Sequence, residues 1–282
     1  MQPVPTASIV IPTRGRPEYL RVALASITAQ ARRAGAELVV VDDGENPAVA
    51  QIAAANEATL IRTPRAGANA ARNAGIATAQ GEIVVLIDDD VAAPAGWLAA
   101  LLTGVAQTPE HEVFGGPIRA RLEGGGPRSC GRESPPITTL DYGDSDRDVP
   151  LVWSANMAIR RSALARVGLF DESIHGRGEE EEWERRYAAQ GGRIRYLAAA
   201  GLEHRRDAAD ARLLRLTAAA YQLGRSARHY DERKGGPPSV VAELRTLAGC
   251  LWHIARRRCA GGIVLAGHSA GRLREVLVGA RT

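Results

Sequence analysis

The chain has 282 residues, a formal net charge of +4 and a hydrophobic fraction of 45%, which suits a folded protein with one large core or a core and an appendage. No run approaches the roughly 18 apolar residues that a membrane-spanning helix needs, and the N-terminus lacks the basic-then-apolar pattern of a signal peptide. The three cysteines, Cys130, Cys250 and Cys259, form no CxxC pair, and an odd number is typical of a reducing compartment. These features argue against a disordered chain or a disulfide-rich secreted domain, and they predict a cytoplasmic protein.

Charge is divided unevenly along the chain. Residues 201–282 hold 15 of the 36 basic residues and 7 of the 32 acidic residues, a net charge of +8, which leaves −4 for residues 1–200. A mildly acidic body followed by a basic tail predicts two parts with different neighbours.

The N-terminal part of the chain alternates between short apolar runs and longer segments with helical periodicity. Strands are expected at residues 7–12, 37–43, 58–63 and 82–87, and helices at 17–34, 47–56, 67–79 and about 94–107. This alternation predicts an α/β unit with a mostly parallel sheet. Ligands bind beyond the carboxyl ends of such strands. The acidic clusters Asp42–Asp43 and Asp88–Asp90, which each follow a strand, should therefore face the same crevice.

The segment 115–150 differs from the rest, because it is rich in Gly, Pro, Ser and Asp. This composition predicts a long loop that is either a functional flap or partly disordered. Order is expected to resume with strands at 152–159 and 193–198 and with helices at 161–167 and 178–192; after His204 the pattern is helical and basic. We therefore expect one domain at 1–204 and a helical extension at 205–282.

Three consecutive carboxylates, Asp88, Asp89 and Asp90, end the apolar run at 83–87. They would repel one another unless they lie in open solvent, as a turn, or meet something cationic. Oxygen ligands of this kind suit Mg²⁺ or Mn²⁺. The cluster alone leaves the turn and the cation site open.

Four segments, taken together, resemble a known family. They read "SIVIPTRGRPEYL", "VVVDDG", "GANAARNAGIATAQGEIVVLIDDDV" and "GLFDESIHGRGEEEEW", and they fall in order between residues 7 and 204. The sequence resembles the family 2 inverting glycosyltransferases, whose GT-A fold is a Rossmann-like nucleotide-sugar-binding domain. The resemblance implies transfer of a sugar from a UDP-, dTDP- or GDP-linked donor to an acceptor hydroxyl, with Mn²⁺ or Mg²⁺ as the cofactor.

The resemblance also implies roles for single residues. Asp90, together with Asp88 and His204, would bind the metal. Glu180 would be the general base, with Glu179 as the alternative, because the family's Glu-Asp motif reads Glu-Glu here. The nucleotide sugar would be bound by Pro12, Thr13, Arg14, Asp42, Asp43, Arg72, Asp88 and Asp89, and the acceptor side would hold Asn156 and Trp183. The other glutamates of the run, Glu181, Glu182 and Glu184, fit an ordinary acidic first turn of a helix.

Two other functions are compatible with an α/β core that binds nucleotides. A sugar-phosphate nucleotidyltransferase would have a Gly-rich basic loop after its first strand, but "PTRGRPEYL" is one glycine short of that pattern. A non-catalytic nucleotide-sugar-binding protein would have lost the base or the aspartate cluster, and both are present. Neither alternative is favoured, and we expect no nucleic-acid partner.

The C-terminal stretch 240–277 has apolar segments interrupted by Arg256, Arg257 and Arg258. It can pack as helices on the catalytic domain or on a partner subunit, which allows oligomerisation. Alternatively it lies on an anionic membrane at the cytoplasmic face, with Trp252 at the interface, which suits a lipid-linked acceptor. Packing is the favoured interpretation.

Overall fold

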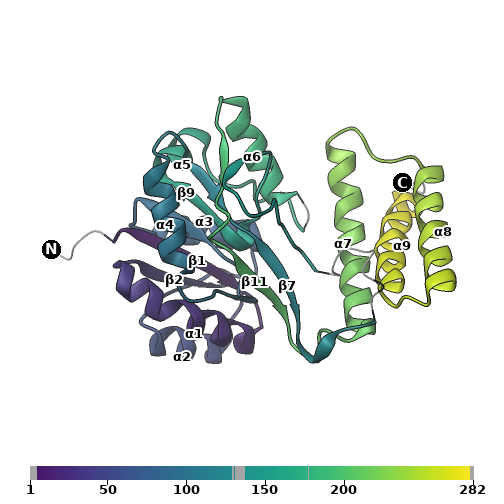
Figure 1. Cartoon of the computed structure of the whole chain (residues 1–282), viewed down its shortest axis with the longest axis horizontal. Helices are drawn as coiled ribbons and strands as arrows, with labels where there is room; N and C mark the ends of the chain where they lie inside the picture. Colours follow the sequence, from purple (N-terminus) through teal and green to yellow (C-terminus); the bar gives the residue numbers. More distant parts are fainter. Residues whose placement is uncertain (1–4, 129, 131–136, 177, 280–282) are drawn as a thin grey trace. The chain divides into compact units, whose positions relative to one another are not determined.

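The computed structural model describes residues 5–128, 130, 137–176 and 178–279. The chain forms two compact units, which are drawn in Figure 1. The sheet unit consists of Met1–Arg119, Thr139–Ser173 and Glu179–His204, and the helical unit of Ala120–Thr138, Ile174–Gly178 and Arg205–Thr282. The chain enters the helical unit for the last time after His204, which is the domain boundary expected from the sequence. Two earlier segments also belong to the helical unit.

A large mixed sheet forms the centre of the sheet unit. Among the described residues its strand order is β3-β2-β1-β4-β9-β6-β10-β8. The strands are β1 (Ala7–Thr13), β2 (Glu37–Asp42), β3 (Thr59–Arg62), β4 (Ile83–Leu86), β6 (Val113–Gly115), β8 (Arg147–Val149), β9 (Met157–Arg160) and β10 (Ile194–Tyr196). The first four pair in parallel, whereas β9 runs antiparallel to both β4 and β6. The predicted α/β fold is confirmed, with its parallel part confined largely to the N-terminal half.

Helices pack against this sheet. They are α1 (Pro17–Ala34), α2 (Pro47–Ala55), α3 (Ala68–Thr78), α4 (Trp97–Gln107), α5 (Arg161–Val167) and α6 (Glu179–Ala189). In α1 and α2 a proline occupies the first turn, where its missing N–H is not needed. A Cβ on Gly75 of α3 would lie 2.3 Å from Val10 Cγ1, so only glycine lets α3 lie directly on β1.

The prediction of one long loop at 115–150 is wrong in part. Strands β7 (Ile118–Leu122) and β8 lie inside this segment; residues 129 and 131–136 of it lie outside the described residues. Both strands are short and carry charged residues, so neither shows the apolar run by which a buried strand is recognised. Strand β7 belongs to a small sheet in the order β5-β11-β7, with β5 at Val91–Ala92 and β11 at Leu202–Arg206.

The described residues of the helical unit form three long helices, α7 (Leu213–Arg233), α8 (Val240–Arg257) and α9 (Gly261–Gly279). Helix α9 contacts both α7 and α8. Two glycines make the α7–α9 contact close, because a Cβ on Gly224 would lie 2.0 Å from the His268 carbonyl oxygen and one on Gly271 2.0 Å from that of Tyr221. Within the described part of the chain, every helix is too short or too polar to cross a bilayer.

Candidate active site

A pocket of about 300 Å³ lies at the carboxyl edge of the parallel strands. The pairing register places Thr13 at the end of β1 beside Asp42 at the end of β2, and β4 lies on the other side of β1. The pocket is lined by Pro12, Thr13, Arg14, Arg16, Asp43, Ala68, Ala71, Arg72, Asp88 and Asp89. All the residues predicted to bind the nucleotide sugar therefore line one pocket, except Asp42.

The aspartate cluster is met by cationic and hydroxyl groups of the chain itself. Thr13 Oγ1 donates a 2.7 Å hydrogen bond to Asp89 Oδ2. Arg16 Nη1 donates to Asp90 Oδ2 at 2.8 Å, and its Nη2 donates to Asp89 Oδ1. The turn in open solvent is not what the structure shows, because Asp89 and Asp90 are buried.

These cations do not neutralise the cluster completely. Burial raises the pKa of Asp89 to about 7, and the charge of Arg16 offsets only part of this effect. Burial and the neighbouring Asp90 also raise the pKa of Asp88, against the opposing charges of Arg72 and His204. The ionised forms of Asp88 and Asp89 are therefore disfavoured in the protein alone, and a further cation beside them would stabilise these forms.

Asp88, Asp90 and His204 come together as a group suited to a divalent cation. Each offers one ligand atom, and these atoms lie within 4.8 Å of one another. The Nε2 atom of His204 is 2.9 Å from Asp90 Oδ1, because β11 pairs with β5 in a register that places His204 beside Val91. Two carboxylates and one imidazole form a donor set that Mn²⁺ or Mg²⁺ can use. The three residues predicted as metal ligands thus lie together.

Arg72 of α3 connects the aspartate cluster with the glutamates of α6. Its side chain is 7% exposed; Nη1 donates to Glu179 Oε2 at 2.6 Å, and Nη2 is 3.8 Å from both Asp88 Oδ1 and Glu180 Oε1. Burial alone would lower the pKa of Arg72, but Glu180, Glu179 and Asp88 raise it overall. Arg72 therefore remains charged and holds the two acidic motifs at a fixed separation.

The two glutamates differ in their surroundings. Glu179 is buried in its ion pair with Arg72. The side chain of Glu180 is 13% exposed, and its Oε1 accepts hydrogen bonds from the backbone N–H of Ser154, at 3.3 Å, and from the Ser154 hydroxyl. Glu180 is thus the more accessible of the two, and its carboxylate is oriented by η2 (Ser154–Asn156).

The two aspartates that follow β2 have different environments. Asp43 lines the pocket, and its carboxylate accepts from Thr63 Oγ1 at 2.8 Å and from the N–H groups of Ala66 at 2.7 Å and Gly67 at 3.2 Å. Asp42 is fully buried; its Oδ2 accepts from the N–H of Asn46 at 3.1 Å. Within the described residues its Oδ1 has no hydrogen-bond partner.

The two residues expected on the acceptor side are both buried in the framework. Asn156 Oδ1 accepts from Trp97 Nε1 at 3.0 Å, and its Nδ2 donates to the Ala200 carbonyl at 2.8 Å. Trp183 is 0% exposed and stacks on Tyr187 with ring centroids 5.7 Å apart. Neither side chain lines the pocket, and a contact of either with an acceptor stays a prediction.

Three residues beside the predicted site residues were not identified from the sequence. Arg16 lies in the loop after β1, and its place beyond a strand end was the available signal. Ser154 has no sequence signal, since its role depends on η2 lying beside α6. Glu184, expected as an ordinary residue of an acidic helix, is buried, and burial raises its pKa to about 9. Its Oε1 accepts the Val152 N–H at 2.7 Å.

Comparisons with known proteins identify the family. The model of the family described as Glycosyl transferase family 2 matches residues 8–168. The chain is 31% identical over 215 residues to the pre-mycofactocin glycosyltransferase of Mycobacterium tuberculosis, which covers 72% of this chain and 44% of that protein. The chain thus spans less than half the length of this relative.

Solved structures share the fold at low sequence identity. The mannosyltransferase PcManGT from Pyrobaculum calidifontis, in complex with GDP-Man and Mn²⁺, matches with a TM-score of 0.61 at 16% identity, over 99% of this chain and 81% of that one. GalNAc-T7 with UDP, GalNAc and Mn²⁺ matches with a TM-score of 0.58 at 16% identity, over 92% of this chain and 55% of that one. The chain belongs to glycosyl transferase family 2 and has the GT-A fold.

Proposed function

We propose that this chain is an inverting glycosyltransferase that moves a sugar from a nucleoside-diphosphate donor to an acceptor hydroxyl. The observation that carries the proposal is the position of Arg72, whose Nη2 is 3.8 Å from both Asp88 and Glu180. A group of carboxylates suited to a metal and a carboxylate suited to a base therefore lie on either side of one buried cation. Transfer from a nucleotide sugar needs both, because the leaving nucleoside diphosphate gains negative charge while the acceptor hydroxyl must lose its proton.

The leaving group would be stabilised by the aspartate side of the site. Asp88, Asp90 and His204 would hold Mn²⁺ or Mg²⁺, which when bound supplies positive charge to the departing diphosphate. Arg14 and Arg16 line the same pocket, so they would add charge to the phosphate groups. The pairing of Arg16 with Asp89 and Asp90 keeps its guanidinium at the site before a donor arrives.

The acceptor hydroxyl would lose its proton to Glu180. A base must reach the hydroxyl within hydrogen-bond distance as the new C–O bond forms, and Glu180 is the more exposed of the two candidate glutamates. Ser154 and Arg72 hold its carboxylate in place. Glu179, which is paired with Arg72 inside the protein, would act as a positioning residue.

The nucleoside would bind between the loops after β1 and β2. Asp43 lines the pocket there, while Asp42 Oδ1 is a buried acceptor without a donor in the described part of the chain. Asp42 is fully buried, so Asp43 is the carboxylate that a base bound in the pocket would reach, and its oxygens can accept an N–H of the base.

The stereochemistry of the product tests the proposal. One base facing one leaving group implies a single displacement at the anomeric carbon, so an α-linked donor should give a β-linked product. Proton NMR of the earliest product, made with a donor found by screening nucleotide sugars for thermal stabilisation, measures this. A retained configuration would contradict both the inverting mechanism and the role of Glu180.

The same assay separates the alternatives. A nucleotidyltransferase would release inorganic diphosphate from a nucleoside triphosphate, whereas the proposed reaction releases a nucleoside diphosphate. A binding protein without activity would be stabilised by the donor but would release neither.

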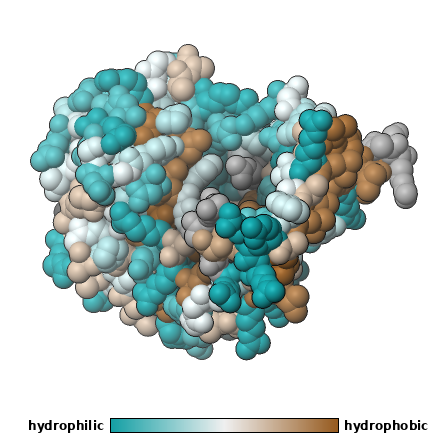
Figure 2. Space-filling view, turned by 45° about the vertical axis from the view of Figure 1, so that its right-hand side comes forward, coloured by the Kyte–Doolittle hydropathy of each residue, from teal (hydrophilic) through white to brown (hydrophobic). Residues whose placement is uncertain are grey.

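We further propose that the acceptor is presented at an anionic membrane surface. Apolar side chains are open to solvent on the helical unit (Figure 2). On α8 they recur at helical spacing, so they share one face: Val241 is 57% exposed, Leu244 51%, Leu251 55% and Trp252 70%. The exposed Arg256, Arg257 and Arg258 follow at the end of the helix, a charge pattern that suits lipid phosphates.

Vesicle sedimentation tests this surface. The protein should bind vesicles that contain anionic phospholipid and should lose binding when Trp252→Ser is introduced or when salt is raised, because the attraction is screened. The variant Leu169→Ser, which changes an exposed leucine of the sheet unit, serves as a control and should bind normally. Equal binding to neutral vesicles, or none to either, would contradict the proposal.

A further inference from the structure

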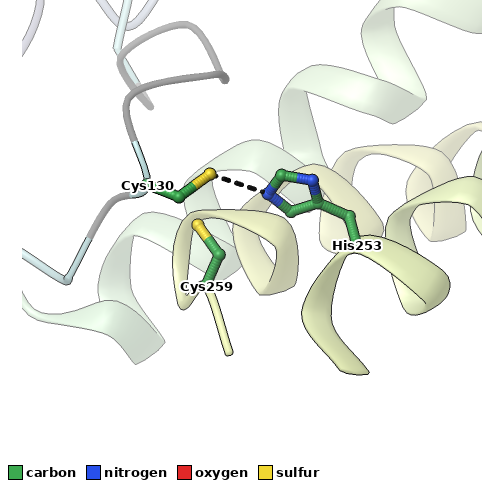
Figure 3. A group of neighbouring side chains, drawn as sticks. All are labelled: Cys130, His253 and Cys259. Atoms are coloured by element: carbon green, nitrogen blue, oxygen red, sulfur yellow. Dashed lines mark hydrogen bonds between the residues drawn. The ribbon is translucent and has the colours of Figure 1, made fainter. Parts of the chain in front are cut away.

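Two of the three cysteines meet a histidine in the helical unit (Figure 3). Cys130 follows the short helix η1 (Glu123–Gly125), His253 lies near the end of α8, and Cys259 lies between α8 and α9. Cys130 Sγ is 3.3 Å from His253 Nε2. One ligand atom from each of the three residues lies within 4.8 Å of the others. Residues from three places in the sequence thus point toward one another.

The spacing of these three ligand atoms is close to that in a tetrahedral Zn²⁺ site. A tetrahedral Zn²⁺ with Zn–S bonds of about 2.3 Å and Zn–N bonds of about 2.0 Å holds its ligand atoms about 3.5–3.8 Å apart. The observed separations need only small side-chain movements to reach this geometry. Thiolate ligands also select Zn²⁺ over Mg²⁺ and Mn²⁺, so this group differs in kind from Asp88, Asp90 and His204.

Close contacts hold the backbone around His253 and Cys259. The Arg128 carbonyl accepts the N–H of Ala260 at 3.1 Å and lies 3.9 Å from Cys259 Sγ. Arg258 ends α8 in the left-handed conformation, with φ of 49°, and the next residue, Cys259, is 2% exposed. A Cβ on Gly262 would lie 3.2 Å from His253 Cδ2, so the backbone of α9 packs directly against the imidazole.

We propose that Cys130, His253 and Cys259 form a site for Zn²⁺, with water as the fourth ligand. Binding converts both thiols to thiolates and releases two protons to solvent, while His253 binds as the neutral imidazole. The metal would tie the segment that carries Cys130 to the junction of α8 and α9. Because folding and binding are coupled at such sites, zinc would stabilise the helical unit.

A disulfide between Cys130 and Cys259 is the competing interpretation. It would need an oxidant to accept two electrons and would leave His253 without a role. The experiment must therefore separate a metal that depends on the histidine from a bond that depends on the sulfurs alone.

The test uses the untagged full chain, purified with a reductant, stripped with a chelator and dialysed against Zn²⁺. Bound zinc is counted by mass spectrometry, and free thiols are counted with a chromogenic reagent. We expect one zinc per chain and protection of two of the three thiols. Replacement of Zn²⁺ by Co²⁺ should give the absorption of a tetrahedral thiolate complex.

Variants locate the site. His253→Ala and Cys130→Ser should lose the zinc and the thiol protection, and Cys259→Ser should do the same, although its burial makes it the variant most prone to unfold. Cys250→Ser, at a cysteine of α8 outside the group, should retain the metal, and so should Asp90→Ala. A chain that binds no zinc when reduced, or a His253→Ala variant that binds as the wild type does, would overturn the proposal. A disulfide between Cys130 and Cys259 that persists in the protein purified with reductant, with no zinc bound, would overturn it as well.

Discussion

Buried carboxylates have different surroundings in the two units. In the helical unit, Glu243 of α8 is 3% exposed and accepts from Arg272 Nε of α9 at 2.6 Å, and Arg272 Nη2 is 2.8 Å from Asp231 of α7. Hydrogen bonding from Arg225 lowers the pKa of Glu275. These carboxylates are neutralised by arginines on neighbouring helices, so they hold the three helices together.

In the sheet unit, burial instead raises the pKa values of Asp88, Asp89 and Glu184. Burial disfavours their ionised forms, and nearby cations or hydrogen bonds offset this only in part. Shifted pKa values of this kind are typical of sites that await a ligand or move a proton. We expect this difference to separate carboxylates that stabilise the fold from those that take part in chemistry, and variants in the two units test it, from the largest expected effect to the smallest.

Loss of Asp90 should have the largest effect. The variant Asp90→Ala should abolish sugar transfer and the thermal stabilisation by Mn²⁺, because it removes a ligand of the proposed metal. Cooperative unfolding should persist without metal, since the change also relieves repulsion from Asp88 and Asp89. Transfer assays and thermal melts with and without MnCl₂ measure both effects. Full activity of the wild type in EDTA would contradict the metal dependence.

Glu180→Gln should have the next largest effect. Glutamine keeps the shape and the hydrogen bonds from Ser154 but cannot accept a proton, and base catalysis typically contributes about 10²–10⁴-fold to kcat. Steady-state kinetics should show this loss in kcat, while donor binding by calorimetry stays close to that of the wild type. The matched variant is Glu179→Gln. If it alone abolishes turnover, the base is Glu179 and the two roles are exchanged.

The sequence predicted most of the parallel half of the fold. Apolar runs with strand length and prolines at helix starts gave β1, α1, β2 and α2 to within one or two residues, because local preference and burial agree there. Helix α4 starts at Trp97, later than the predicted Pro94. The strands of the second half were harder, since β8 and β11 are short and charged, and pairing with neighbours rather than composition makes them strands.

The same distinction applies to the site. The aspartate cluster and Glu180 were proposed from motifs, because the proposed chemistry needs those residue types in order along the chain. The contacts of Arg16, Ser154 and Glu184 depend on which segments the fold brings together. The proximity of Cys130 and Cys259 also depends on the fold, because the two residues are too far apart in the sequence to form a local motif.

The pH dependence of stability tests the comparison of the two units at Glu184. Its pKa in the folded protein, about 9, lies above the ordinary value of 4.5. Between these values the folded protein holds a proton that the unfolded chain has released, so stability falls as pH rises, by up to about 1.4 kcal/mol per pH unit. Glu184→Gln should remove this slope and raise the melting temperature at neutral and higher pH.

The matched change in the helical unit should have the opposite sign. Glu243→Gln leaves the buried Arg272 with less opposing charge, so it should lower the melting temperature at the same pH. Thermal melts of both variants between pH 5 and pH 9 measure the difference. The comparison between the units fails if both substitutions destabilise the protein.

The smallest effects are expected from two glycines of the helical unit. A Cβ on Gly271 would lie 2.0 Å from the Tyr221 carbonyl oxygen, whereas one on Gly249 of α8 would meet no described atom within 4 Å. Gly271→Ala must separate α7 from α9 and should cost about 1–3 kcal/mol. Gly249→Ala should instead stabilise the helix by about 0.5–1 kcal/mol, because alanine loses less conformational entropy than glycine in a helix. Urea unfolding followed by far-UV circular dichroism measures both. Similar losses for the two variants would mean that helix propensity and close packing do not explain the glycines, whereas opposite signs would show that α9 is held by direct backbone contact as well as by paired charge.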